Sequence, residues 1–222
     1  LLALTDGEQV DTVLLRYRTR YSVCVSTQVG CRCGCAFFAT GQMGFHRQLR
    51  AGEIVAQVIH YQRTFAGHDD RAVTNVVFMG MGEPLLNYEP VRQTINLLLD
   101  DHAYGFSRRR VTVSTVGVVP RVHQLGRETP VNLAVSLHGV SNAVRDRIVP
   151  INRSFPLERL LQACREYPLP KGRRITFEYV MLDRVNDSPE EAQSLAHLLK
   201  GIPAKVNLIP FNPFPEAAFQ CS

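Results

Sequence analysis

Short apolar runs alternate with amphipathic helical stripes along most of this chain, and this alternation restricts the fold more than any other feature. The expected strands cover residues 21–27, 73–79, 110–114, 131–137, 175–181 and 205–209, and the expected helices between them cover 49–63, 90–99, 119–125, 157–164 and 188–199. Strands that alternate with helices build βαβ units around a parallel sheet. We therefore expect an α/β fold that closes only in part, an incomplete TIM-type barrel of about six βα units.

The length of 222 residues suits one large domain. We expect a lead-in segment at 1–19, the partial barrel at 20–210 and a tail at 211–222. The most linker-like stretch is 64–71, which is short and polar.

Polar or glycine-rich positions close most of the expected strands. They are the cysteine loop 31–38, Gly82 and Glu83 in a Gly-Met-Gly-Glu-Pro turn, Ser114, the run Ser136, Leu137 and His138, and Asn212. In parallel barrels the carboxyl ends of the strands carry the active site. The alternation thus predicts that these positions converge on one rim of the barrel.

The cysteine loop carries the clearest chemistry. Cys31 and Cys35 have the first spacing of a C-x₃-C-x₂-C loop, which would offer three thiolates to an iron–sulfur cluster, and Phe38 stands at the third position. Clusters are held mainly by thiolates, and a phenyl ring cannot replace one. Cys33 is an alternative ligand, but the loop would have to curl to bring it beside the other two.

A zinc site is a further alternative for the cysteine loop. Zinc ligands usually come as two spaced pairs, and no second pair is evident, because Cys164 lies in a helical stripe and Cys221 is nearly terminal. Six cysteines, three of them within five residues, indicate metal or redox chemistry in a reducing compartment rather than a disulfide frame.

Several of these residues also have purely structural interpretations. Gly82 and Glu83 could form only a tight turn, although a carboxylate there could also accept from the ammonium group of a ligand. His138 taken alone is more often a structural histidine, and Asn212 could simply begin a turn. Cys24, between two valines, is expected to be a buried small hydrophobic residue.

Charge and hydropathy narrow the class of protein. The formal net charge of +5 and the pI of about 9.0 permit an anionic partner without requiring one. No apolar run approaches the ~20 residues that cross a bilayer, and no signal-peptide pattern opens the chain. We expect a cytoplasmic protein with no membrane contact and no obligate protein partner.

Seven motifs in order carry a resemblance that covers nearly the whole chain. They are CVSTQVGC at 24–31, ATGQMGF at 39–45, FMGMGEPLLN at 78–87, SLH at 136–138, IVPIN at 148–152, FEYVML at 177–182 and NLIPFNPF at 207–214. Together they resemble the RlmN/Cfr family of radical S-adenosylmethionine (SAM) RNA methyltransferases. The resemblance implies a radical SAM core, a [4Fe–4S] cluster and SAM as cofactors, and methylation of C2 of adenine in 23S ribosomal RNA and some transfer RNAs.

The resemblance also implies roles by position. Cys31 and Cys35 would ligate the cluster, and Phe38 occupies the place of the third ligand. SAM contacts would come from Gly82, Glu83, Ser114, Ser136, Leu137, His138 and Asn212. Asp11 falls where the family has a glutamate proposed as proton acceptor. The family's reaction follows a radical route, because the C2–H of adenine is not acidic enough for ordinary methyl transfer.

This chain departs from the family in ways that allow other functions. It ends before the family's methyl-carrying cysteine and opens after the position of its N-terminal RNA-contacting domain. A non-catalytic binder of SAM or RNA is therefore an alternative, and a zinc protein is a weaker one. We also expect the last strand, 205–209, to be an uncovered edge that favours self-association.

Overall fold

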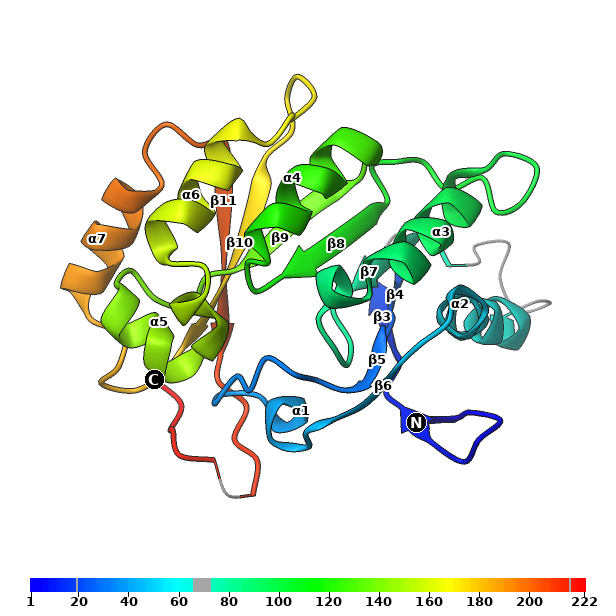
Figure 1. The fold of residues 1–222 in the computed structure, drawn as a ribbon, viewed down its shortest axis with the longest axis horizontal. Coiled ribbons are helices and arrows are strands. Elements are labelled where there is room, and N and C mark those ends of the chain that lie inside the picture. The colour runs from blue at the N-terminus through cyan, green and yellow to red at the C-terminus, as the bar shows by residue number, and fades with distance from the viewer. Residues whose placement is uncertain (19, 66–72, 216) are drawn as a thin grey trace. The chain divides into compact units, whose positions relative to one another are not determined.

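The structure is a computed structural model that describes residues 1–18, 20–65, 73–215 and 217–222. The chain forms two compact units, the first made of Leu1–Cys31, Phe45–Ser114 and Thr129–Asn132, and the second of Arg32–Gly44, Thr115–Glu128 and Leu133–Ser222. Parallel strands joined by helices occur in both units, which confirms the expected α/β class (Figure 1). Most of the linker-like stretch 64–71 lies outside the described residues.

The first unit combines a parallel ladder with antiparallel hairpins. Its elements are β1 (Leu2–Ala3), β2 (Gln9–Val10), β3 (Val13–Tyr17), β4 (Arg20–Cys24), β5 (Gln28–Gly30), β6 (Phe45–Gln48), α2 (Ala51–Phe65), β7 (Asn75–Phe78), the 3₁₀ helix η1 (Pro84–Asn87), α3 (Tyr88–Leu99) and β8 (Val111–Thr115). The strands β4, β7 and β8 are parallel neighbours in that order. Their carboxyl ends therefore share one edge.

The core of the first unit follows from the pattern of its strands and helices. Val23, Val76 and Phe78 are fully buried on β4 and β7. The stripe expected on the first helix is also buried, with Ile54 and Val58 at 0% exposure, and α2 contacts α3. Apolar residues at period two in strands and near 3.6 in helices thus meet in one core.

Three hairpin pairings in the first unit were not predicted from the sequence. β3 pairs antiparallel with β4, β1 with β2, and β5 with β6. The first expected strand, 21–27, is also shorter, because β4 ends at Cys24. Just beyond it, the backbone of Ser26 is held by the Gln57 side chain, through Ser26 N to Oε1 at 2.8 Å and Nε2 to Ser26 O at 2.9 Å.

The second unit contains a three-stranded parallel ladder, β9, β10 and β11, with helices between the strands. Its elements are α1 (Ala39–Gln42), α4 (Val119–Glu128), β9 (Asn132–Ser136), α5 (Asn142–Ile148), the 3₁₀ helix η2 (Pro150–Arg153), α6 (Leu157–Glu166), β10 (Ile175–Met181), α7 (Pro189–Leu198) and β11 (Ala204–Pro210). The fifth expected strand coincides with β10. Helices α4 and α6 pack against each other through buried stripes that the sequence predicted.

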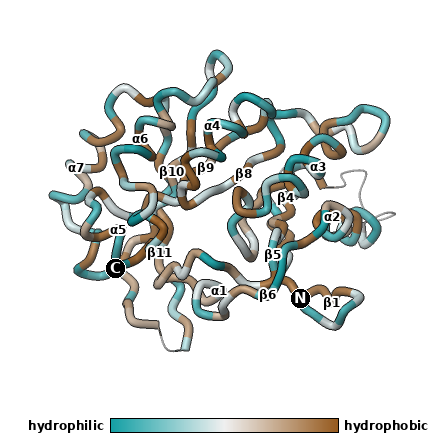
Figure 2. Tube along the Cα trace, viewed as in Figure 1, coloured by the Kyte–Doolittle hydropathy of each residue, from teal (hydrophilic) through white to brown (hydrophobic). Residues whose placement is uncertain are grey.

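Local capping fixes where α7 begins. The Ser188 hydroxyl accepts from the backbone N–H of Glu191, and Pro189 occupies the first helical position. A serine cap followed by proline at the first helical position is a strong start signal for a helix. Hydropathy alternates between teal and brown along the helices, as one buried face requires (Figure 2).

No helix in the described part of the chain is long and apolar enough to cross a membrane.

Candidate functional site

The glycine-rich turn after β7 is tied to the segment that follows β4. The backbone N–H of Gly80 donates to Val25 O at 3.0 Å, and that of Met81 donates to Ser26 Oγ at 2.8 Å. A Cβ on Gly80 would lie 2.7 Å from Ser26 Oγ. Glycine is therefore required here by close approach of the two backbones.

Gly82 has a second and different reason to be glycine. Its φ of +94° is in the left-handed region, and a Cβ would lie 2.5 Å from Gln28 Cβ. Gln28 in turn accepts from the Glu83 N–H at 2.8 Å through its Oε1. The turn is thus held rigidly, with the Gln28 side chain packed directly against the backbone of Gly82.

Glu83 is buried, with 3% of its surface exposed. Its Oε1 accepts from Leu85 N at 3.0 Å and so caps η1. The carboxylate has a structural role as helix cap, as the tight-turn interpretation requires. Capping engages one of its two oxygens in this bond.

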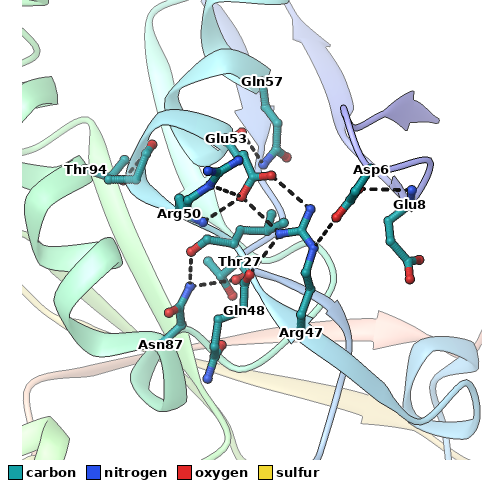
Figure 3. Close-up of polar contacts among 12 residues, drawn as sticks. Asp6, Glu8, Thr27, Arg47, Gln48, Arg50, Glu53, Gln57, Asn87 and Thr94 are labelled. Carbon is teal, nitrogen blue, oxygen red and sulfur yellow. Dashed lines mark hydrogen bonds and ion pairs between the residues drawn. The ribbon is translucent and has the colours of Figure 1, made fainter.

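Asn87 braces the segment that follows β4, as Figure 3 shows. Asn87 Nδ2 donates to Thr27 O at 2.8 Å and to Leu49 O at 2.7 Å. Thr27 Oγ1 is fully enclosed and has no hydrogen-bond partner among the described residues. The segment between β4 and the cysteine loop is therefore rigidly packed.

An ion-pair network supports β6 in the same view (Figure 3). Arg47 donates to Asp6 Oδ2 at 2.7 Å through Nε and to Glu53 Oε1 at 2.9 Å through Nη2. The Arg47 guanidinium is the main cause that lowers the pKa of Glu53 to about 2. Glu53 therefore stays ionised at neutral pH and ties the start of α2 to β6.

Asp11 is placed beside the glycine-rich turn through its backbone. Its N–H donates to Met81 Sδ at 3.2 Å, and its carbonyl accepts from Ser26 Oγ. Its surface is exposed. Asp11 thus shares the first unit with Gly82, Glu83 and Ser114, which is buried near the end of β8.

The cysteine loop turns sharply rather than running extended. Gly34 has a φ of +62°, and the Ala36 N–H donates to Ile148 O at 3.0 Å. Cys33 and Cys35 are buried, whereas Phe38 is 48% exposed just before α1. The loop is therefore not an extended segment, in which alternate cysteines would point to the same face.

His138 has a left-handed backbone conformation, and both its ring and its carbonyl accept hydrogen bonds. Its φ is +56°, its Nδ1 accepts from Val180 N at 3.1 Å, and its carbonyl accepts from Asn186 Nδ2 at 2.7 Å. Phe37 of the cysteine loop packs edge-on against the imidazole at 4.4 Å between ring centroids. Strained backbone of this kind clusters at functional sites.

The imidazole of His138 is neutral. Burial first, and then the Arg145 charge, lower the pKa of His138 to about 3. Because Nδ1 accepts from a backbone N–H, the proton of the neutral ring is on Nε2. His138 can therefore donate from Nε2 to a ligand without changing charge between pH 5 and 8.

Arg145 is a site residue that the sequence analysis missed. It is fully buried, and its Nε donates to Asn152 Oδ1 at 2.9 Å. Its terminal nitrogens donate to the carbonyls of Ser136, Leu137 and Val116. The guanidinium thus fixes the backbone of the run that ends β9 and leads to His138.

Burial lowers the pKa of Arg145 to about 10, so the group keeps its charge at neutral pH. Cys35 of the cysteine loop, Cys164 and Asp146 oppose this fall in the pKa of Arg145. Arg145 stands in a short charged stretch with Asp146 and Arg147, and no periodicity or motif distinguishes it there. Its role was therefore not readable from the sequence.

Asn212 and Cys24 are the other residues that the sequence analysis discussed. Asn212 follows β11 and is exposed. Cys24 is half-buried, and burial raises the pKa of its thiol to about 11, which agrees with a structural role. Gly82, Glu83 and Asp11 gather in the first unit, and Ser136, Leu137 and His138 gather with the Cys35–Phe37 part of the loop in the second.

Comparison with known proteins decides the family. Residues 25–196 match the Radical SAM superfamily. The chain belongs to the radical SAM superfamily. A crystal structure of a radical SAM methyltransferase from Sphaerobacter thermophilus superposes with a TM-score of 0.94 at 49% identity, over 99% of this chain and 64% of that one. The partial-barrel fold expected from the sequence is thereby confirmed.

Several curated relatives of this radical SAM chain share one name. The chain is 51% identical over 220 residues to the dual-specificity RNA methyltransferase RlmN of Syntrophobacter fumaroxidans. It is 55% identical over 218 residues to the protein of the same name from Anaeromyxobacter dehalogenans. These matches cover 99% and 96% of the chain but 64% and 59% of the relatives. The chain thus spans about six tenths of their length. SuiB of Streptococcus suis, at 12% identity and a TM-score of 0.60, shares the fold alone.

Radical SAM proteins use a [4Fe–4S] cluster and SAM. Of the expected SAM contacts, His138 fits a polar cofactor because its Nε2–H can donate to a ligand, whereas the space beside Gly82 is already filled by the Gln28 side chain. The cysteine loop does not fit a cluster with three protein thiolates, because Phe38 holds the third position. Within the described ranges, no three His, Cys, Asp or Glu side chains gather as metal ligands.

Proposed function

We propose that this chain is the core of an RlmN-type enzyme that methylates C2 of adenine in 23S ribosomal RNA and in some transfer RNAs. The observation that carries this proposal is about 50% identity over nearly the whole chain to proteins named dual-specificity RNA methyltransferase RlmN. The net charge of +5 suits a phosphate-bearing partner. Such an enzyme acts in the cytoplasm, without a membrane or an obligate protein partner.

The site residues divide into three roles. We assign cluster ligation to Cys31 and Cys35 and proton acceptance to Asp11. SAM contacts are assigned to Gly82, Glu83, Ser114, Ser136, Leu137, His138 and Asn212. The rigid turn around Gly82 and the neutral, immobilised imidazole of His138 support this assignment, because both groups are held in place before any ligand arrives.

Phe38 makes the chain incomplete as a catalyst. Two thiolates at the family positions leave the cluster short of one protein ligand, and cluster sites depend on thiolate donors. The exposed ring of Phe38 lies at the surface, so replacement by cysteine leaves no buried cavity. Activity is therefore expected only when position 38 is cysteine.

A segment exchange tests the proposal. Residues 1–222 would replace the matching segment of the Syntrophobacter relative, once with Phe38 and once with Phe38→Cys, in cells that lack their own enzyme. Mass spectrometry of ribosomal and transfer RNA would then report 2-methyladenosine. We expect methylation with Phe38→Cys and none with Phe38.

The two exchanged chains separate the parts of the proposal. A folded Phe38→Cys chimera that carries a cluster but leaves all RNA unmethylated would show that the chain is not an adenine-C2 methyltransferase core. Methylation by the Phe38 chimera would show instead that the missing thiolate is dispensable.

A non-catalytic binder of SAM or RNA is the second candidate. The specific observation that favours it is the phenyl ring at position 38. It predicts that the natural chain binds SAM or RNA while holding no cluster. Calorimetry with SAM and filter retention of 23S RNA fragments test this, and the absence of both signals would eliminate it.

A further inference from the structure

The far end of the β3–β4 hairpin in the first unit is basic and aromatic. It carries the sequence Arg-Tyr-Arg-Thr-Arg-Tyr at 16–21. Its described members are Arg16, Tyr17, Arg18 and Arg20, which are exposed, and Tyr21, which is half-buried. We call these five residues the basic hairpin end. No aspartate or glutamate occurs at 12–52, so no carboxylate is near them along the chain.

Cross-strand stacking holds two of these arginines in place. Tyr17 pairs with Arg20 across the hairpin, and Cζ of Arg20 lies 4.5 Å from the centroid of the Tyr17 ring. Arg16 pairs with Tyr21 at the next position, with 5.9 Å between Cζ and the ring centroid. Paired residues share a face and successive residues alternate, so the two pairs lie on opposite faces. Each face of the hairpin therefore presents one guanidinium beside one phenol ring.

The arginines of the basic hairpin end keep their charge unneutralised. None of the three forms an ion pair within the described part of the chain, in contrast to Arg47, which engages both Asp6 and Glu53. A guanidinium that stacks on a ring uses its flat face, and its N–H donors lie in its plane. The donors of the stacked arginines can therefore serve an external acceptor.

The basic hairpin end is remote from the glycine-rich turn of the same unit. Arg20 is the first residue of β4, whereas the register of β4 with the parallel strand β7 begins only at Ser22. The glycine-rich turn follows the carboxyl end of β7. The five residues of β4 span roughly 16 Å at about 3.3 Å per residue. The basic hairpin end is therefore a surface separate from that turn.

A second run of arginines continues the same edge of the first unit. The three arginines at 108–110 directly precede β8 and are exposed. Thr74 joins this run to the hairpin, because its N–H donates to Tyr21 O at 2.9 Å and its carbonyl accepts from Arg110 Nη1 at 3.4 Å. Positive charge thus extends from the hairpin along the amino ends of the parallel strands.

The residue types of the basic hairpin end select the partner. Guanidinium groups bind phosphate oxygens through two parallel hydrogen bonds. Tyrosine rings stack on unpaired bases, and Tyr17 is 46% exposed. Single-stranded RNA offers phosphates and unpaired bases together, and grooves that bind it combine positive charge with aromatic rings. An acidic peptide would use the arginines but not the rings.

We propose that the basic hairpin end binds an unpaired stretch of RNA, with Arg16, Arg18 and Arg20 on phosphates and Tyr17 stacked on a base. This inference rests on the proposed function, which supplies RNA as the partner. The surface adds affinity and takes no part in the chemistry, because it lies at the opposite end of the strands from the glycine-rich turn.

Fluorescence anisotropy with a labelled oligouridine of about 12 nucleotides tests the charged groups. The natural chain is compared with a triple variant that combines Arg16→Gln, Arg18→Gln and Arg20→Gln. Each phosphate contact to a single strand contributes about 0.7 to the slope of log affinity against log salt. The triple variant should therefore have a slope smaller by about 2, and it should bind about 100-fold more weakly at about 0.1 M salt.

A matched triple variant controls for net charge. It combines Arg127→Gln, Arg159→Gln and Arg165→Gln, which remove exposed arginines from α4 and α6. Its affinity should fall by less than about threefold, because only screened long-range attraction is lost. Equal losses in the two triple variants would show that net charge, rather than the basic hairpin end, holds the RNA.

Tyr17→Leu tests stacking without a change of charge. It should weaken oligouridine binding about tenfold with the same salt slope. Binding of inorganic polyphosphate, which has no bases, should not change. An equal loss on both probes would contradict base stacking by Tyr17.

A lysine triple variant shows that a loss in the glutamine triple variant is not caused by misfolding. Replacing the three hairpin arginines with lysine keeps the charge but removes the planar donors. It should restore the salt slope and recover only part of the affinity. A lysine variant that is as weak as the glutamine variant, with the same reduced slope, would contradict direct phosphate binding.

Three further results would overturn the proposal. They are no oligouridine binding by the natural chain at about 0.1 M salt, unchanged binding by the glutamine triple variant, and equal competition by polyglutamate and oligouridine at the same charge. Each of them leaves the methylation test of the proposed function untouched. Conversely, unmethylated RNA in the Phe38→Cys chimera, together with hairpin-dependent oligouridine binding, would overturn the methyltransferase assignment alone.

Discussion

Replacing Arg145 with methionine should destabilise the second unit severely. The guanidinium donates to Asn152 Oδ1 and to the carbonyls of Ser136, Leu137 and Val116, and it is 0% exposed. Each buried acceptor left without a donor costs about 1–3 kcal/mol. Relaxation and entering water reduce the sum, and breaking a buried charged network typically costs about 3–5 kcal/mol. We therefore expect Arg145→Met to lower the free energy of unfolding by about 4 kcal/mol.

Urea unfolding followed by far-UV circular dichroism measures this effect. With a slope of about 2–3 kcal/mol per molar urea, the transition that reports the second unit should move down by about 1.3–2 M. Arg159→Met is the matched control, because Arg159 is exposed on α6, and its midpoint should stay within experimental error. A change below about 1 kcal/mol for Arg145→Met would refute the view that this buried charge organises the end of β9.

Three further predictions address the turn, the imidazole and the sheet edge. Gly82→Ala should cost about 2 kcal/mol more than Gly105→Ala in urea unfolding, because both have positive φ but only Gly82 would place a Cβ 2.5 Å from Gln28; equal costs would argue against a close approach. Since burial lowers the pKa of His138 from 6.5 to about 3, the unfolded state binds a proton first as the pH falls. Stability should then drop by about 1.4 kcal/mol per pH unit from pH 6 to 4, and a His138→Gln variant with the same slope would contradict this. Leu208 is 56% exposed on β11, the last strand in the sheet order; light scattering should show self-association that Leu208→Lys reduces, whereas a natural chain that stays monomeric at high concentration would show that the edge is already protected.

The strands and helices that alternate in the sequence were predictable because their apolar periods are strong. The β10 strand and the capped start of α7 were assigned correctly, since each had an uninterrupted pattern or an explicit cap. The antiparallel partners β3 and β6 were missed. β6 is mostly polar, and β3 is apolar but largely exposed, so neither shows the alternation of a half-buried strand. Their pairing is decided by tertiary contacts that no local pattern contains.

The residues of the candidate site also differ in whether a local sequence pattern indicates them. Gly82 and His138 follow strands in recognisable motifs, so the sequence indicated them. Arg145 was not identified, because a buried arginine looks like a surface charge in a sequence. Only the carbonyls around Arg145 reveal what its side chain contacts.

The central claim is that this is a radical SAM core that lacks one cluster thiolate. Anaerobic reconstitution with iron and sulfide, followed by electron paramagnetic resonance after reduction, tests it most directly. Phe38→Cys should bind about four irons per chain and give a [4Fe–4S] signal that SAM alters. The natural chain and the control Met43→Cys, which adds an exposed cysteine elsewhere, should hold little iron. A folded Phe38→Cys chain without cluster signal, or a natural chain with the full signal, would contradict the account.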